Sequence, residues 1–292
     1  MTIRVEDVER GDILLVTQKS GDALAEMIID YDRSPSCFSH SGIAGGDGTI
    51  ISSYPDSLDG LRPVDVGGLH HDDFSHFWKL EQKIHRLVLP DDVDREAALK
   101  RLDDYPKSRS TRFGLASIVV VAGALHALNH EGRIGQEGTA EIVWAAITAA
   151  EAWASPDEFF CAEFSATIYD LTSVPFTVGD LRPPEELVRS AQDMARRVLI
   201  QLGLKGLLFG RSDEEQETLI DFVAAVEQYD PEFFDEGVKV LFEAVLDGLG
   251  VRRSRGLELP DSTPVPAALI TPRMLEAWCG GVTEEIQQPA KT

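Results

Sequence analysis

A thiol nucleophile and its base are the chemistry that this sequence offers most clearly. The chain has three cysteines, Cys37, Cys161 and Cys279, and His40 lies in a glycine-rich stretch, "SHSGIAGGDG" (39–48). A cysteine attacks as its thiolate, so it needs a base within hydrogen-bond reach and an electropositive setting. The first question is therefore which cysteine can meet His40.

Cys37 is close to His40 only along the chain. If residues 37–44 form a strand, residues an odd number apart point to opposite faces of the sheet. His40 then shares a face with Gly42, whereas Cys37 lies on the other face. We therefore expect Cys37 to take no part in a local cysteine–histidine pair.

Cys161 stands at the start of a predicted helix in "FFCAEFSATIYDL" (159–171). Free backbone N–H groups and the helix dipole at such an end favour a negative sulfur, and the same N–H groups could hold the oxyanion of a tetrahedral intermediate. Phe159 and Phe160 precede the cysteine and would help to exclude water. Free cysteine is also among the most buried residue types and is then usually inert. From local features alone, both interpretations stay open.

Three motifs occur in a characteristic order. They are Gly11-Asp12 before an apolar strand, then Ser39-His40-x-Gly42-Ile43, then Cys161-Ala162-Glu163-Phe164. Two further segments, "STRFGLASIV" (110–119) and "ITPRML" (270–275), fit the same pattern. This order resembles the circularly permuted branch of the NlpC/P60 papain-like superfamily, which includes the YiiX/YaeF-type amidases and, more distantly, the lecithin retinol acyltransferase-like enzymes. The resemblance covers about residues 9–180 and 265–280.

The resemblance implies Cys161 as nucleophile and His40 as base, in an α+β, permuted papain-like fold with a small antiparallel sheet packed on helices. Gly42 would leave space on the histidine's own face of the strand. The family's third polar group falls at Ser52, which can accept a hydrogen bond from the imidazole but cannot stabilise an imidazolium as a carboxylate does. Residues expected to line the site or contact substrate are Ser39, Gly42, Tyr54, Phe160 and Glu163, the last of which either points into the site or stabilises the helix start.

The implied function is a cysteine-dependent hydrolase or acyltransferase that acts on an amide, ester or thioester bond through an acyl-enzyme. Its substrate would be a small molecule, a lipid-acyl group or a peptide, and it would use no cofactor and no metal. "HHDDFSH" (70–76) contains metal-ligand residue types, but we expect it to be a loop at the substrate side. Ser52 motivates the alternative: a catalytically weak or inactive papain-like scaffold that binds a ligand or a protein partner.

The composition of the chain limits which classes of partner it can bind. The 292 residues include 50 acidic and 27 basic side chains, a formal charge of −23, which argues against DNA, RNA or an anionic membrane as partner. Three cysteines suit a reducing compartment, and "MTIRVEDVERGD" has no signal-peptide core. The most apolar run, 115–128, is too short to span a bilayer. We therefore expect a cytoplasmic protein without an integral membrane segment, and the sequence leaves its oligomeric state open.

Short apolar or β-branched runs predict strands at 12–18, 40–46, 48–54 and 85–90, with a hairpin turn at 46–49. Helical spacing predicts helices at 21–31, 91–105, 114–130, 138–154 and 159–171, with Thr271 capping another that begins at Pro272. The predicted organisation is a catalytic domain at 1–182 with a helical insertion at about 106–157, a helical accessory region at 183–262, a segment packing back at 263–280 and a flexible tail at 283–292.

Overall fold

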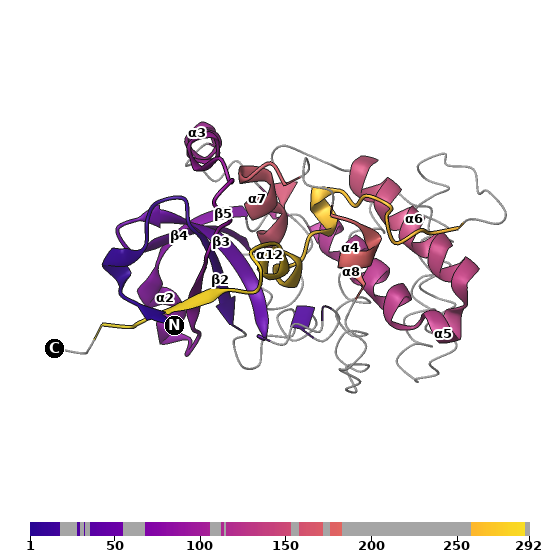
Figure 1. The fold of residues 1–292 in the computed structure, drawn as a ribbon, viewed down its shortest axis with the longest axis horizontal. Helices are drawn as coiled ribbons and strands as arrows, with labels where there is room; N and C mark the ends of the chain where they lie inside the picture. The colour runs from indigo at the N-terminus through magenta and orange to yellow at the C-terminus, as the bar shows by residue number, and fades with distance from the viewer. Residues whose placement is uncertain are drawn as a thin grey trace, which may run out of the picture.

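The computed structural model describes residues 1–17, 36–54, 68–105, 115–152, 158–171, 176–182 and 258–289, together with residues 28, 29, 32, 112 and 113. Its fold is α+β, as predicted, and is built on one seven-stranded sheet with helices on both faces (Figure 1). The accessory region predicted at 183–262 and the helix predicted at 21–31 lie almost entirely outside the described residues.

The large sheet has the strand order β1-β9-β6-β2-β3-β4-β5. The β1–β9 pair is parallel and every other neighbouring pair is antiparallel, so the sheet is larger than expected and mixed. The strands are β1 (Thr2–Ile3), β2 (Ile13–Thr17), β3 (Phe38–Gly46), β4 (Thr49–Tyr54), β5 (Gly68–Asp73), β6 (Ile84–Leu87) and β9 (Thr283–Ile286), and a separate parallel pair is formed by β7 (Arg112–Phe113) and β8 (Glu158–Phe159).

The predicted hairpin joins β3 to β4. Asp47 and Gly48 form its two-residue turn, and both have positive φ, 51° and 72°. Two successive positive φ values define the tight turn that matches the twist of neighbouring strands, and Asp-Gly is a preferred sequence for it. This turn fixes how the residues of β3 face those of β4.

The helices begin where the sequence places their capping residues. The Asp94 side chain accepts a hydrogen bond from the Ala97 N–H, and the Thr271 side chain accepts one from the Met274 N–H ahead of a proline at the first helical position. The predicted helices at 91–105, 114–130, 138–154 and 159–171 are confirmed within a few residues. The helical elements are η1 (Val5–Asp7), α2 (Phe74–Lys79), α3 (Arg95–Asp104), α4 (Leu115–Asn129), α5 (Glu131–Ile134), α6 (Gln136–Ala152), α7 (Cys161–Ile168), α8 (Val178–Leu181), η2 (Ala267–Leu269) and α12 (Pro272–Trp278).

The two faces of the sheet bury separate apolar clusters because side chains alternate along each strand. On β2, Ile13 and Leu15 belong to the larger cluster, which includes residues of α7 and α12; we call this the helix face. Leu14 and Val16 belong to the smaller cluster, which includes Phe74 and Phe77 of α2; we call this the α2 face. Figure 1 shows α7 and α12 between the sheet and the helices α4 and α6.

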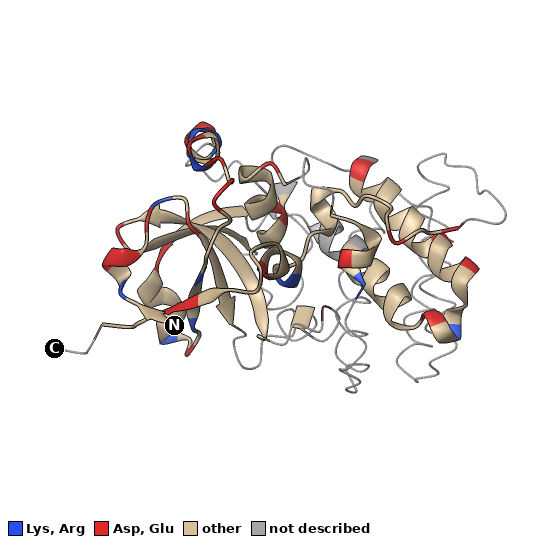
Figure 2. Ribbon diagram, viewed as in Figure 1, with Lys and Arg blue, Asp and Glu red and all other residues tan. Residues whose placement is uncertain are grey.

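Helices α4 and α6 pack against each other; α4 contains no Asp, Glu, Lys or Arg, whereas α6 contains Glu137, Glu141 and Glu151 (Figure 2). Their buried residues include Ala124, Leu125, Ile142, Val143 and Ala146. None of the described helices combines the length and the apolar composition needed to cross a membrane.

Two predicted segments differ from the structure. Residues 283–286 of the expected flexible tail form β9, which pairs with β6 and β1, and Ile286 is buried in the α2-face cluster. The segment at 70–76, expected to be a loop, lies in the edge strand β5 and the helix α2 that follows it. Strand β5 pairs with β4 from Thr49↔Asp73 to Tyr54↔Gly68. Neither segment has the apolar alternation from which a strand is recognised in a sequence, because each lies at the polar margin of the sheet.

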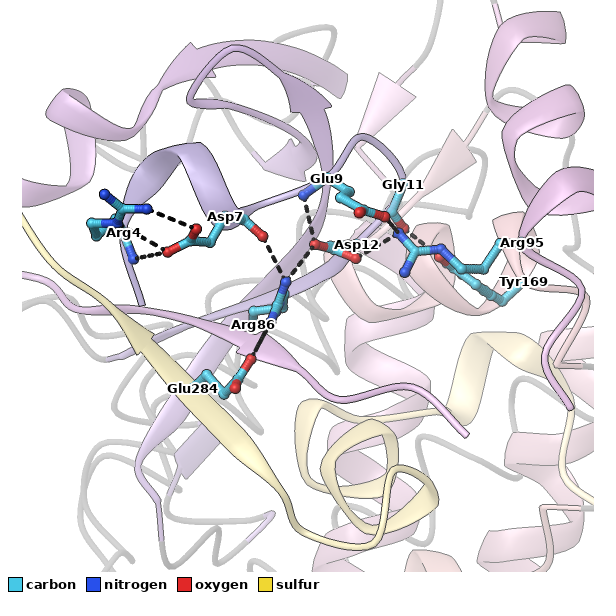
Figure 3. A network of polar contacts seen from close by, with 9 residues as sticks. All are labelled: Arg4, Asp7, Glu9, Gly11, Asp12, Arg86, Arg95, Tyr169 and Glu284. Carbon is cyan, nitrogen blue, oxygen red and sulfur yellow. Dashed lines mark hydrogen bonds and ion pairs between the residues drawn. The ribbon is translucent and has the colours of Figure 1, made fainter. Parts of the chain in front are cut away.

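The Gly11-Asp12 motif anchors the start of β2 (Figure 3). Asp12 is 1% exposed; one carboxylate oxygen accepts from the Glu9 N–H at 2.8 Å and the other from the Arg95 guanidinium at 2.7 Å. The Tyr169 hydroxyl, just after α7, donates to the Gly11 carbonyl. Two of the three motifs are thereby joined, because the anchor connects the first strand of the site to the helix that carries Cys161.

Candidate active site at a fork between two strands

Strands β3 and β4 part at one end. Their pairing runs from Gly46↔Thr49 to Ile43↔Ile51, and the described residues show no pair beyond it. Over the same stretch β3 stays paired with β2 as far as Phe38, and β4 stays paired with β5 as far as Tyr54. We call this opening, between residues 38–41 and 53–54, the fork.

The start of α7 closes the fork on the helix face. The Ser53 hydroxyl donates to the Phe159 carbonyl at 2.6 Å, which ties the entry of α7 to β4. On the other side, the hydroxyl oxygens of Ser41 and Ser165 are 3.3 Å apart, which ties α7 to β3. The first residue of the helix, Cys161, is therefore held between the two strands.

Glu163 stabilises the beginning of this helix. Its carboxylate accepts a hydrogen bond from the Phe160 N–H at 3.2 Å, and the side chain is buried. A carboxylate in the first turn of a helix also interacts favourably with the helix dipole. Of the two roles expected for Glu163, the structure supports the one at the helix start. Phe160 is the N-cap residue and is buried beside the cysteine.

The Cys161 thiol lies within a group of hydrogen-bond donors. Hydrogen bonding from the backbone N–H and the hydroxyl of Ser41 and from the backbone N–H of Ala162 lowers the pKa of this thiol. The residue is 4% exposed, and this burial raises the pKa of the thiol to about 11, while the hydrogen bonds act in the opposite direction. Burial outweighs the donors, so the resting surroundings of the thiol favour its neutral form.

His40 occupies the α2 face. It is paired with Val16 of the α2-face cluster, and its ring stacks on Phe77 with centroids 6.1 Å apart and meets the Tyr54 ring edge-on at 5.8 Å. Burial lowers the pKa of the imidazole to about 4; the charge of Asp72 raises it and that of His70 lowers it. The buried Nε2 atom has no hydrogen-bond partner among the described residues.

The structure brings Cys161 to the fork but does not form the expected hydrogen bond to His40. Ser41 faces α7 because it pairs with Leu15 of the helix face, so its predecessor His40 points to the α2 face. The thiol contacts the chain neighbour of His40, and the imidazole flanks the same opening from the other side of β3. The two side chains therefore lie on opposite faces of the sheet.

The other predicted residues divide between these two sides. Ser52 is fully buried on the α2 face, and its hydroxyl has no partner within the described chain, so it does not orient His40. Gly42 lets β4 approach, because a Cβ there would lie 2.7 Å from Ser52 Cβ. Ser39 is buried at the irregularity where the β2–β3 register shifts, and the Tyr54 hydroxyl donates to Asp72 at 2.6 Å.

Sequence reasoning missed Ser41, His70 and Asp72. Ser41 could have been found from strand alternation: if His40 points away from Cys161, the next residue of the strand points toward it. His70 and Asp72 lie in the segment predicted to be a loop, and only the β4–β5 register (Ser52↔His70, Ile50↔Asp72) places them beside the fork.

The remaining cysteines differ from Cys161 in their surroundings. Cys37 is exposed. Cys279 is buried, and burial raises its pKa to about 12 without any hydrogen bond that acts against it. In the part of the chain that the structure describes, no group of three or more His, Cys, Asp or Glu residues is arranged to hold a metal ion.

Comparisons with family models, with curated proteins and with solved structures found no match to this chain. The likeness to permuted papain-like enzymes therefore rests on the motifs quoted above.

Proposed function

We propose that this protein is a permuted papain-like cysteine hydrolase or acyltransferase acting on an amide, ester or thioester bond, with Cys161 as nucleophile and His40 as base. One observation carries the proposal: Cys161 is the first residue of α7, held between β3 and β4 by the contacts of Ser53 and Ser41. The donors of Ser41 and Ala162 there favour its thiolate against the effect of burial. A cysteine that only fills a core has no need of such donors. Cys279 of the same chain has none that affects its pKa.

The reaction follows from these groups. His40 takes the thiol proton, the sulfur attacks the acyl carbon, and a carbon–sulfur bond forms. The negative charge that develops on the acyl oxygen requires N–H donors, which the first turn of α7 supplies. The imidazolium then gives its proton to the leaving amine, alcohol or thiol, and water or a second acceptor releases the acyl group from the sulfur.

The proposal requires the imidazole to turn toward the fork. In the resting arrangement His40 Nε2 makes no hydrogen bond to the described residues that this turn would break, and the ring would leave its contacts with Phe77 and Tyr54. Because β3 and β4 are not paired at this end, no backbone ladder lies between the ring and the thiol on the β4 side.

A second candidate is a papain-like scaffold that binds a ligand or a protein without turnover. Three observations favour it: burial raises the pKa of the Cys161 thiol to about 11, burial lowers the pKa of His40 to about 4, and no hydrogen bond joins the two side chains. A protein with this resting arrangement as its only arrangement would hold an inert thiol.

Alkylation separates the two candidates. Iodoacetamide labelling of each cysteine would be followed by mass spectrometry from pH 6 to 9 in the wild type and in His40→Ala. If His40 acts as base, we expect Cys161 to react at pH 7 at least about 10-fold faster than in the variant. Cys37 gives the rate of an exposed thiol, and Cys279 gives that of a buried thiol without donors.

A Cys161 rate that equals the Cys279 rate at every pH, and that His40→Ala leaves unchanged, would contradict the enzyme and support the scaffold. Cys37 must react equally in both proteins, which shows equal exposure to the reagent. The buried Cys279 must stay equally slow in both, because unfolding of the variant would expose it.

A further inference from the structure

A group of polar side chains covers the α2 face next to the fork. His40 and Ser52 contribute from β3 and β4, Tyr54 from the end of β4, and His70 and Asp72 from β5. The β4–β5 register pairs Ser52 with His70 and Ile50 with Asp72, so all five side chains project from the same face of the sheet.

Contacts with β5 hold Tyr54 in place. Its hydroxyl donates to Asp72 Oδ2 at 2.6 Å, its ring stacks on the His70 ring with centroids 3.9 Å apart and planes at 17°, and its carbonyl is 3.1 Å from His70 Nε2. The Tyr54 ring also contacts the His40 ring edge-on. Tyr54 therefore holds the Asp72 carboxylate at a set position relative to the imidazole.

Proton transfer in the proposed reaction places a positive charge on His40. The described groups that face it are Asp72 and His70 on β5, Tyr54 on β4, Val16 on β2 and Phe77 on α2. Asp72 alone in this group carries a negative charge. Ser52 cannot play this part, because a hydroxyl is neutral and this one makes no hydrogen bond to the ring.

We propose that Asp72, held by the Tyr54 hydroxyl, is the positioning residue that stabilises protonated His40 and takes the place expected for Ser52. Its catalytic meaning rests on the proposed function, whereas the electrostatic link between the two residues does not. Asp72 is partly buried, so less solvent screens its charge than that of an exposed carboxylate. The Asp72 charge accordingly raises the pKa of His40, against the larger effect of burial.

The direct test is the titration of the His40 ring by NMR, with its signal assigned by its loss in His40→Ala. In Asp72→Asn we expect the midpoint to fall, so that the protonated fraction of His40 at a fixed pH above the midpoint drops about 3- to 10-fold. Tyr54→Phe, which keeps the ring and removes the bond to Asp72, should give a smaller drop. Samples must be dilute, because so acidic a chain approaches zero net charge in this pH range.

Asp73→Asn is the matched control. Asp73 is the next residue of β5, it is exposed, and its side chain does not cap α2. It carries the same charge but projects from the other face, so we expect it to leave the His40 midpoint within about 0.2 pH units of the wild type, well inside an opposite charge's usual effect. Equal midpoints in Asp72→Asn and Asp73→Asn would overturn the proposal.

Cys161 alkylation keeps this test separate from that of the proposed function. If His40→Ala slows alkylation while Asp72→Asn changes neither alkylation nor the His40 midpoint, the proposed function stands and the role of Asp72 is wrong. If Asp72→Asn lowers the His40 midpoint while the Cys161 alkylation rate is unchanged in both His40→Ala and Asp72→Asn, the electrostatic link holds and the proposed enzyme is wrong. Ser52→Ala should leave the His40 midpoint and the alkylation rate unchanged, and a Ser52→Ala effect larger than that of Asp72→Asn would return the supporting role to Ser52.

Discussion

Two buried polar regions of this protein differ in how completely their atoms are bonded. Around Asp12, both carboxylate oxygens accept hydrogen bonds and two arginines lie against the charge (Figure 3). At the fork, His40 Nε2 and the Ser52 hydroxyl are buried without partners in the described chain. Most buried polar groups in folded proteins are bonded, so the second arrangement is the unusual one.

The difference separates a region that stabilises the fold from one that keeps unpaired polar groups. A fully bonded buried network fixes one arrangement, because any departure leaves a group without a partner. The anchor at Asp12 does this for β2, α3 and α7. Unpaired buried groups destabilise the fold, and proteins retain such local violations mainly at functional sites. The contrast therefore agrees with the fork as the working part and with Asp12 as its support.

The strongest way to break the contrast is to remove the anchor. Asp12→Ala removes the buried partner of Arg95 and Arg86 and the acceptor of the Glu9 N–H. Both arginines are partly exposed and keep Glu9 and Glu284 as partners, so we expect the free energy of unfolding to fall by about 2–4 kcal/mol, less than for a fully buried pair. Urea denaturation followed by circular dichroism measures this change. Asp7→Ala, which removes an exposed carboxylate of the same region, should change stability by less than about 1 kcal/mol.

A change in pH tests the fork without a large structural change. Burial lowers the pKa of His40 to about 4, below the ordinary value of about 6.5, so between these values the unfolded chain binds a proton that the folded protein refuses. Stability is therefore highest above pH 6.5 and is lost as the pH falls toward 4. For this one group the loss is on the order of 2–3 kcal/mol.

His40→Phe isolates that contribution, because it keeps a ring against Phe77 and removes the titrating group. As the pH rises through this window, the unfolding free energy of the wild type should increase relative to that of the variant. Carboxylates titrate in both proteins and cancel in this comparison. Parallel stability curves from pH 4 to pH 7 would show that His40 is not buried in its neutral form.

Two adjacent serines give the finest comparison. The Ser53 hydroxyl donates to the Phe159 carbonyl at 2.6 Å, so Ser53→Ala should destabilise the protein by about 1–2 kcal/mol by leaving a buried acceptor unpaired. The Ser52 hydroxyl bonds nothing in the described chain, so Ser52→Ala should be neutral or stabilising by up to about 1 kcal/mol. Thermal unfolding of both variants measures the difference, and equal losses would mean that Ser52 has a partner after all.

The sequence predicted those elements whose local signals agree with the tertiary structure. Asp47-Gly48 is a turn wherever it joins two short apolar runs, and Thr271 followed by proline begins a helix for reasons contained within four residues. The start of α7 at Cys161 was predictable in the same way, from apolar residues at helical spacing.

The arrangement of the site depended on register, which no local signal contains. The face of β3 that His40 occupies follows from its pairing with Val16, and the identity of the third group near it follows from the pairing of β4 with β5. A family pattern names the residues that meet but not the rotation of each strand. Ser52 was expected for its position along the chain, whereas Asp72 is beside His40 because of a strand that has almost no apolar residues.

The order of the sheet also has a kinetic consequence. Thr2 pairs with Glu285 and Leu87 with Thr283, so an edge of the sheet assembles from segments at opposite extremes of the sequence. Contacts of such long separation are slow to form, because the intervening chain must lose entropy before they can stabilise anything. During synthesis β6 would wait, with one backbone edge open to other strands, until the last of these segments leaves the ribosome. Lys83, which directly precedes that strand, and Arg86 on it later pair with Glu285 and Glu284. Until then such basic residues discourage edge-to-edge association.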